Sequence, residues 1–115
     1  MTIFELLNKT GKPYYRYGSV PRETATDFFT FQQIDQIEIL STDNEIQLKA
    51  DVYDVVYYTS SPEYIYTPLD DFCRDAKTDG WTLERLPRDI ATDEPNMFGR
   101  LARLAKIDYN TIRAK

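Results

Sequence analysis

The chain has 115 residues, 42% of them hydrophobic and 14% aromatic, which is enough for the core of one folded domain and excludes wholesale disorder. Its formal net charge of −5 repels nucleic-acid backbones and anionic membrane surfaces, so neither is an expected partner. The sequence has no histidine and one cysteine, which excludes histidine-dependent nucleophilic systems and the usual Cys/His zinc sites within this chain.

The N-terminal segment predicts a short helix from Thr2 to Lys9, because Thr2 and Glu5 have the spacing of a capping box. Tyr14 to Tyr17 is predicted to be extended, and the polar stretch from Gly18 to Thr26 to be a loop. No basic start and apolar run of a signal peptide precedes these elements, and the lone cysteine fits a reducing compartment. We therefore expect a soluble chain made in cytoplasm.

Two strands are predicted next. Phe28 to Ile34 is aromatic on both faces, and residues 37–40 extend it as a hairpin arm into a polar turn at 41–44. The clearest strand follows, because four apolar residues alternate with polar ones and Tyr53 faces outward with the polar set. The apolar set, predicted to be buried, is Ile46, Leu48, Ala50 and Val52. Asp54 interrupts it, which predicts a bulge or a sheet edge nearby.

The main helix is predicted from about Pro68 to Thr78. Two capping boxes compete for its start, Ser60 with Glu63 and Thr67 with Asp70, and a bent turn is expected before it. Its apolar stripe is Leu69, Phe72, Cys73 and Ala76, and Gly80 is its predicted stop.

The C-terminal part predicts a strand over 81–86, ended by Pro87, and then a polar loop over 88–96. Residues 97–109 leave two interpretations open. The spacing of Met97, Leu101 and Leu104 and the helix-prone composition favour a helix. The strand over 81–86 needs a neighbour, however, and a hairpin with this segment is the simplest one.

Acidic residues and Cys73 are the remaining chemical candidates. Asp70, Asp71 and Asp75 have the residue type for a hard cation, but the better interpretation is that they complement the helix N-terminus and solvate an outer face. Asp89, Asp93 and Glu94 offer carboxylates without evidence of a pocket, and Cys73 on the apolar stripe favours a buried, inert thiol. We predict no catalytic residue, no metal site and no cofactor.

Nine tyrosines are a more distinctive feature of the composition. One cluster precedes the first predicted strand, and a second surrounds the junction between the clear strand and the main helix. Tyrosine is common at protein interfaces because it buries a large area while keeping a polar group. The tyrosines therefore either surround a small core or form a surface for self-association or for a partner.

Several segments together resemble the small tail-completion, or tail-terminator, proteins of long-tailed bacteriophages and prophages. The matching segments are Phe4-Glu5-Leu6-Leu7, Phe28-Phe29-Thr30-Phe31, Thr42-Asp43-Asn44, the strand from Leu48 to Tyr53, Asp79-Gly80-Trp81, and Thr92-Asp93-Glu94 leading to Leu101. The resemblance spans most of the chain and is one of element order and residue type.

A single domain over residues 1–115 is expected, because the chain has no internal repeat, low-complexity tract or linker. The resemblance implies for it an α+β fold with the order α-β-β-α-β-β. This fold has a short N-terminal helix, an antiparallel-rich sheet of about four strands and one main helix packed on the sheet, and it makes Met97 to Ile107 a strand. The implied function is that of a structural virion protein without enzymatic activity or cofactor. Such subunits, assembled in the host cytoplasm, form a ring, commonly hexameric, that caps the tail tube and meets the head-closure or connector protein.

The expected protein interface comprises Thr42, Asp43 and Asn44 in one loop, Arg88, Asp89, Asp93 and Glu94 in another, and the outward Tyr53. Tyr53→Ala is predicted to impair ring formation more than stability. Three other functions stay open: another head–tail connector or neck protein, a monomeric acidic module that inhibits or regulates a basic partner, and a small enzyme that uses carboxylates.

Overall fold

The computed structural model describes residues 1–21, 27–40, 46–92 and 96–111. Its elements in chain order are α1 (Ile3–Lys9), β1 (Tyr14–Arg16), β2 (Asp27–Leu40), β3 (Ile46–Thr59), the 3-10 turn η1 (Pro62–Tyr64), α2 (Thr67–Thr78), β4 (Thr82–Ile90) and β5 (Phe98–Thr111). Among these residues, no helix is long and apolar enough to cross a membrane.

The strands form one mixed sheet in the order β1-β2-β3-β5-β4. β1 runs parallel to β2, and the three other pairings are antiparallel. The predicted α+β class is confirmed, whereas the expected sheet of about four strands lacks β1. The segment over 14–17 was predicted to be extended, but its pairing with Phe29 to Phe31 is a non-local contact that local pattern does not indicate.

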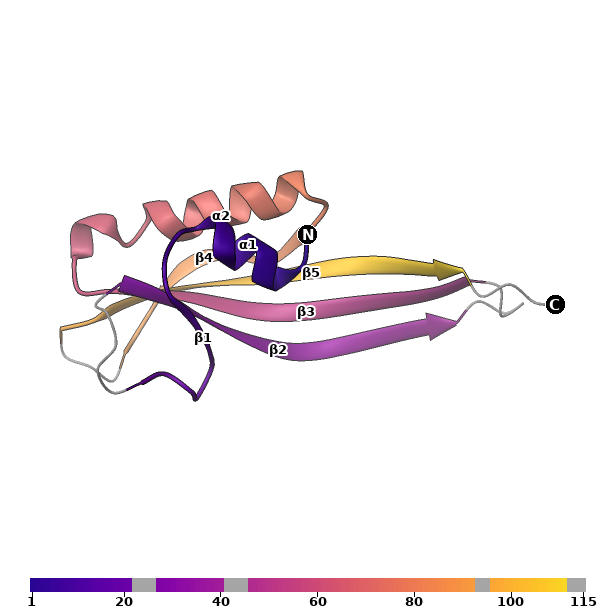
Figure 1. Cartoon of the computed structure of the whole chain (residues 1–115), viewed down its shortest axis with the longest axis horizontal. Coiled ribbons are helices and arrows are strands. Elements are labelled where there is room, and N and C mark those ends of the chain that lie inside the picture. The colour runs from indigo at the N-terminus through magenta and orange to yellow at the C-terminus, as the bar shows by residue number, and fades with distance from the viewer. Residues whose placement is uncertain (22–26, 41–45, 93–95, 112–115) are drawn as a thin grey trace.

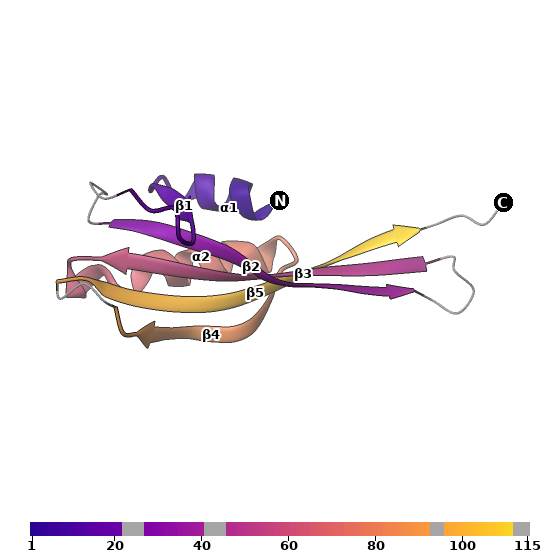
Figure 2. The ribbon, with the colours of Figure 1, turned by 90° about the horizontal axis from the view of Figure 1, so that it is seen from below.

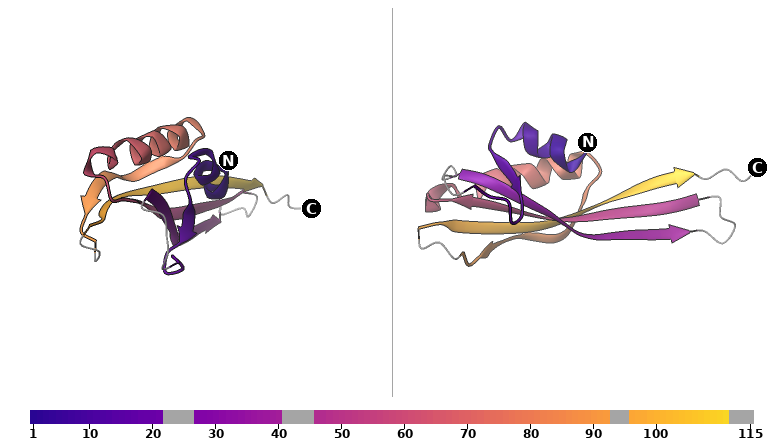
Figure 3. Two further views of the ribbon diagram at one scale, coloured as in Figure 1. Left: turned by 60° about the vertical axis from the view of Figure 1, so that its left-hand side comes forward. Right: turned by 60° about the horizontal axis from the view of Figure 1, so that its bottom comes forward.

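Both α-helices lie on the same face of the sheet, as Figures 1 and 3 show. The core is the layer between the helices and the sheet, and it takes alternate residues from the three central strands. Its largest fully buried side chains are Tyr57, Phe29, Phe72, Ile3, Leu6, Leu7, Leu69, Leu104 and Val55. The sheet face that points away from the helices is called the open face below.

The three central strands continue well past the helices as a narrow antiparallel ribbon (Figures 1 and 2). We call this ribbon the blade; it consists of Gln36–Leu40, Ile46–Asp51 and Lys106–Thr111, and the rest of the chain is the body. The blade gives the molecule principal extents of 58 × 26 × 22 Å and a radius of gyration of 16.4 Å. A compact chain of this length would have a radius of about 13 Å.

Local signals place both helices well. In α1, Glu5 N–H donates to the Thr2 hydroxyl and the Glu5 side chain accepts from the Thr2 backbone N–H, so the predicted capping box forms. In α2, the side predicted to be apolar (Leu69, Phe72, Cys73 and Ala76) is buried, and Gly80, with a φ of 93°, follows the helix end. Neither predicted box at its start forms, because Tyr66 is the N-cap and makes no side-chain cap bond. Pro68 lies in the first turn, where it needs no N–H donor.

The ambiguous C-terminal segment is a strand, so the helix that its local spacing favours is wrong and the strand implied by the resemblance is confirmed. β5 pairs with β3 on one edge and with β4 on the other, and its Ala102 and Leu104 are buried in the core. Pairing on both edges outweighs helix propensity, which is a weak preference of well under 1 kcal/mol per residue.

Two other predictions need correction at β4. The strand continues through Pro87 to Ile90, so Pro87 does not end it and residues 88–90 are not loop. β4 is an edge strand, and its register with β5 shifts between Arg85 and Arg88. Proline is tolerated at such a position because the missing N–H breaks no regular ladder bond.

The bulge predicted near Asp54 lies on the neighbouring strand. The register of β2 with β3 shifts between Gln33 and Asp35, whereas Asp54 itself pairs with Gln32 in the centre of the sheet. The extra residue changes which positions of β2 share a face. Phe29 and Phe31 lie on the helix-covered face, but Ile37 and Ile39, although also odd-numbered, lie on the open face.

Candidate functional site

Three acidic residues on α2 or at its C-cap take part in ion pairs, one of them within the helix. Asp70 contacts the Arg100 guanidinium at 3.4 Å, and Asp71 contacts Arg74 at 3.2 Å. Asp79 accepts from the Met1 amine at 2.5 Å. Within the described ranges, no group of three or more histidine, cysteine, aspartate or glutamate side chains is placed to hold a metal ion. These carboxylates therefore act as structural contacts in this arrangement.

Cys73 lies on the buried stripe of α2 with a relative exposure of 3%. Burial is the main cause that raises the pKa of its thiol to about 12, and the nearby Asp70 carboxylate raises it further. A thiol with this pKa is almost entirely protonated at neutral pH, so it is a poor nucleophile. The prediction of a buried, inert cysteine agrees with these surroundings.

Tyr53 does not face outward as predicted. Its ring lies 6.1 Å from the Trp81 ring, on the helix-covered face of β3, and packs against the core. Burial, followed by the Asp51 carboxylate, raises the pKa of its hydroxyl. The alternation over 46–52 correctly predicted that Tyr53 and Val52 point to different faces of the sheet. Val52 is buried as predicted, at 8% exposure, but at this point of β3 the helices cover the Tyr53 side, so the outward position predicted for Tyr53 is wrong.

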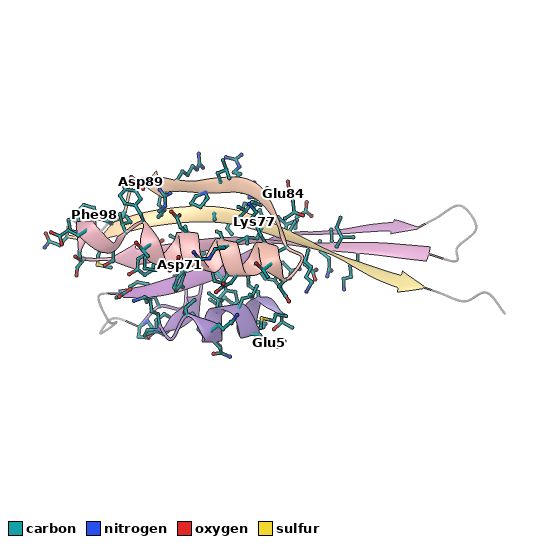
Figure 4. The ribbon with its side chains drawn as sticks, turned by 90° about the horizontal axis from the view of Figure 1, so that it is seen from above. Glu5, Asp71, Lys77, Glu84, Asp89 and Phe98 are labelled. Atoms are coloured by element: carbon teal, nitrogen blue, oxygen red, sulfur yellow. The ribbon has the colours of Figure 1, made fainter. Side chains whose placement is uncertain are left out.

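Of the predicted interface residues on β4, Asp89 is part of a cluster with α2. Its carboxylate accepts from Arg100 at 3.0 Å and from the Tyr66 hydroxyl at 3.4 Å, and the Arg100 guanidinium lies 4.8 Å from the centre of the Tyr66 ring. Figure 4 shows Asp89 on β4 beside α2. Arg88 is exposed and pairs with Leu101. Asp89 therefore contacts Arg100 and Tyr66, whereas its sequence neighbour Arg88 is exposed on β4.

The remaining predicted interface residues lie outside the described residues. They are Thr42, Asp43 and Asn44 between β2 and β3, and Asp93 and Glu94 between β4 and β5. Of the three predicted residues that the structure describes, Tyr53 packs against the core, and Arg88 and Asp89 lie on the edge strand β4.

The described tyrosines divide between the core and the surface. Tyr57 is fully buried and its hydroxyl donates to Asp27, and Tyr14 packs against the core beside Phe31. Tyr17 and Tyr66 are more than half exposed. Tyr57 and Tyr14 therefore belong to the core and its margin, whereas the interface interpretation stays a prediction.

The open face holds an apolar arrangement that the sequence did not assign to a surface. Cross-strand pairing aligns Ile37 with Ala50 and Ile107 in one row, and the next row toward the tip is Ile39, Leu48 and Tyr109. Ile46 pairs with Thr111 beyond them. We call these positions the apolar stripe; its members are Ile37, Ile39, Ile46, Leu48, Ala50, Ile107 and Tyr109.

The open face of the body differs from the stripe in two ways. Its apolar residues are already covered by neighbouring strands: Phe28 stacks on Tyr58 at 5.2 Å, and Val56 is only 7% exposed. It also carries a charged pair, because the Arg103 guanidinium donates to both Asp54 oxygens at 2.8 and 3.2 Å. The stripe positions, by contrast, include no charged residue, and of their described side chains Ile107 is 50% exposed and Ala50 has intermediate exposure.

The sequence signal for this surface was that the apolar positions of β3 switch from even-numbered to odd-numbered residues along the strand. Its apolar positions are even-numbered from Ile46 to Val52, and its core positions are Tyr53, Val55 and Tyr57. Since β3 pairs with β5 without a register shift, the two sets must lie on opposite faces. At one end of such a strand, the apolar core residues lie on the helix-covered face. At the other end, the apolar residues lie on the opposite face.

Comparison with known proteins gives no further assignment: no family model matches the chain, and no curated protein matches it at a significant level.

Proposed function

We propose that this chain is a structural virion assembly protein, the tail-completion subunit that forms a ring at the head-proximal end of a phage tail. The observation that carries the proposal is the apolar stripe, which lies on the blade and whose two described side chains, Ala50 and Ile107, are not part of the described core cluster. Uncharged surface that a fold does not use internally is characteristic of subunits that assemble. Segments along most of the sequence resemble this family, which supports the same function.

The shape of the subunit is also compatible with a ring. A closed ring requires a heterologous interface, in which one surface of each copy meets a different surface of the next. A body 26 × 22 Å in cross-section with a blade protruding along the 58 Å axis offers distinct surfaces for such contacts. The proposed partners are the tail tube protein on one side and a head-closure or connector protein on the other, with no enzymatic step.

Electron microscopy and a tail-joining assay together test this function. The purified protein at high concentration is expected to form rings of tail-tube diameter, and to restore head joining when added to tails that lack it. A protein that stays monomeric and also fails to complete such tails would refute the proposal. Rings that bind heads but not tail tubes would instead identify a connector or neck protein.

A further inference from the structure

We infer that the groove between α2 and β4 binds an acidic segment of a partner protein that also carries an apolar side chain. The inference is separate from the proposed tail function, so either can fail without the other. The groove has a volume of about 510 Å³, and every residue that lines it is described. Its walls come mainly from one side of α2, between Asp70 and Thr78, and from Leu83, Leu86 and Pro87 on β4.

The first observation is an apolar side chain left exposed at the groove. Leu86 is 73% exposed, the highest fraction among the exposed large hydrophobic residues of the described chain. Pro87, its neighbour, and Leu83, which packs against the core, line the same groove. The buried Cys73 completes this apolar lining. An exposed leucine among apolar neighbours is surface that a side chain of a partner can cover.

The second observation is that the charges of the groove oppose those of the whole chain. Three cations line it, Arg74, Lys77 and Arg100, against the single carboxylate of Asp70, whereas the chain has 14 basic and 19 acidic residues. Arg100 is neutralised by Asp70 and Asp89 at 3.4 and 3.0 Å. Arg74 is 71% exposed and pairs only within α2.

Lys77 is the cation most available to a partner. It lies exposed in the last turn of α2 and makes no ion pair with a described residue. Figure 4 shows it on the side of α2 toward β4. A carboxylate of a partner can therefore reach Lys77, with Arg74 one turn away, without displacing a buried ion pair.

The shape of the groove favours a segment of a protein over a small ligand. Pockets for small molecules bury most of the surface of the ligand. Here Leu86 and Arg74 are themselves largely exposed, so the groove covers only one side of an occupant. Strand addition to β4 is not the mode of binding, because its register with β5 shifts twice between Leu83 and Arg88 and Pro87 has no N–H. Side chains must therefore carry the recognition.

The length of the groove matches a short extended segment. Its α2 residues run from Asp70 to Thr78, about 12 Å along the helix axis. About four extended residues span that distance, so an apolar side chain over Leu86 can be followed by a carboxylate near Lys77. The net charge of −5 repels an acidic partner at long range, but salt screens this beyond about 8 Å at physiological ionic strength, whereas the contact with Lys77 is local.

The experiment uses a short fluorescent peptide of alternating leucine and glutamate as the probe. Two control peptides replace every glutamate by glutamine or every leucine by alanine, and binding to the full chain is measured by fluorescence anisotropy. The leucine–glutamate peptide is expected to bind at least about tenfold more tightly than either control, because each control lacks one of the two kinds of contact. Its affinity should fall as the salt concentration is raised from about 50 to about 300 mM.

Two lysine variants locate the binding. Lys77→Glu and Lys9→Glu are matched, because both lysines are exposed in the last turn of a helix and both changes alter the net charge equally, but only Lys77 lines the groove. Lys77→Glu should weaken binding at least about tenfold, and Lys9→Glu should stay within about twofold of the wild type. Leu86→Gln, at a side chain already exposed, should leave the circular dichroism spectrum and the unfolding midpoint unchanged while weakening binding as Lys77→Glu does.

Three outcomes would overturn the inference. The wild type might bind no peptide, bind the control peptides equally well, or lose affinity equally in both lysine variants. Self-association of the wild type that Lys77→Glu abolishes would overturn it as well, by identifying a second copy as the occupant. The tail-joining assay is unaffected by the first three results, so the proposed function is judged separately.

Discussion

At the scale of single residues, aromatic and acidic side chains that looked available for partners hold the body together. Tyr53 contacts Trp81, whose indole N–H donates to the Met1 carbonyl at 3.3 Å. Lys106 donates to the same carbonyl at 3.1 Å and lies over the Trp81 ring. These contacts join the start of α1 to β3 and β5 at the point where the blade leaves the body.

Tyr53→Ala is therefore expected to lower the free energy of unfolding by about 1–2 kcal/mol, less than for a fully buried ring because Tyr53 is only half buried. Tyr53→Phe, which keeps the ring contact with Trp81, should be close to the wild type. Urea unfolding of both variants, alongside their association state, checks this. An alanine variant with unchanged stability and lost assembly would return Tyr53 to the outward, interface role that the sequence alone predicted.

Asp79 makes a pH-dependent contribution to stability at the junction between the body and the blade. A hydrogen bond from the Met1 amine is the main cause that lowers the pKa of its carboxyl, and Lys106 contributes as well. Because the folded pKa lies below the unfolded value of about 3.9, the carboxylate stabilises the fold above that pH. This stabilisation is lost as the pH falls through the folded pKa.

Asp79→Asn should accordingly unfold at a lower temperature than the wild type at pH 6. The difference between the two melting temperatures should shrink as the pH is lowered from about 4 toward 2. Thermal unfolding of both proteins across this range tests the expectation. A difference that stays constant with pH would show that the amide affects packing and that the charge contributes nothing.

At the scale of elements, sequence signals succeeded where the stabilising contacts are local. The Thr2–Glu5 box, the buried stripe of α2 and Gly80 all act within a turn or two of the chain, and all three are present. The elements that local pattern alone could not assign depend on distant partners. β1 exists because it lies beside Phe29, and β5 is a strand because β3 and β4 flank it.

The cap of α1 is the simplest local contact to test. Thr2→Ala removes the acceptor for Glu5 N–H and should lower the free energy of unfolding by about 1 kcal/mol, whereas Thr2→Ser should be near neutral. Chemical denaturation monitored by circular dichroism measures both. If the alanine variant were as stable as the serine variant, the cap bond would contribute nothing to the stability of this helix.

The candidate surface shows the same limit of sequence reasoning. The alternation from Ile46 to Val52 was recognised, but an apolar strand face looks the same in sequence whether helices or a neighbouring molecule cover it. Only the position of α1 and α2 distinguishes the two cases. The loop residues predicted for the interface rested on the resemblance, and most of them lie outside the described residues.

At the scale of the whole molecule, the described core lies in the body, and the blade extends beyond it. The described core cluster takes its residues from the body, from Ile3 to Leu104, and contains no residue of the blade. The ladder is nevertheless continuous from one part to the other, since β3 and β5 pair at every position from Ile46 to Thr59. The blade is thus an extension of the sheet that the body supports.

A shortened chain tests this division. Replacing residues 37–50 by Asn-Gly, which suits a two-residue hairpin turn, and ending the chain after Ile107 removes most of the blade but keeps the Gln36–Asp51 pair. We expect this variant to fold, with a free energy of unfolding within about 2 kcal/mol of the wild type, and to remain monomeric. Two-dimensional NMR and urea unfolding check the fold, and a molten or unfolded product would show that the body depends on the blade.

The position of β5 in the sheet also determines the order in which the fold can be completed. β4 pairs only with β5 among the described strands, and β5 is the last strand of the chain although it occupies an inner place. Its pairing with β3 joins residues 39 to 65 positions apart, so the sheet closes through contacts of long sequence separation, which slow folding. Until β5 is synthesised, one edge of β3 is unpaired and β4 has no neighbour, so a ribosome-bound chain presents an adhesive sheet edge. Premature termination before about residue 98 should consequently yield aggregation-prone fragments, even though every helix and more than half of the core residues would already have been made.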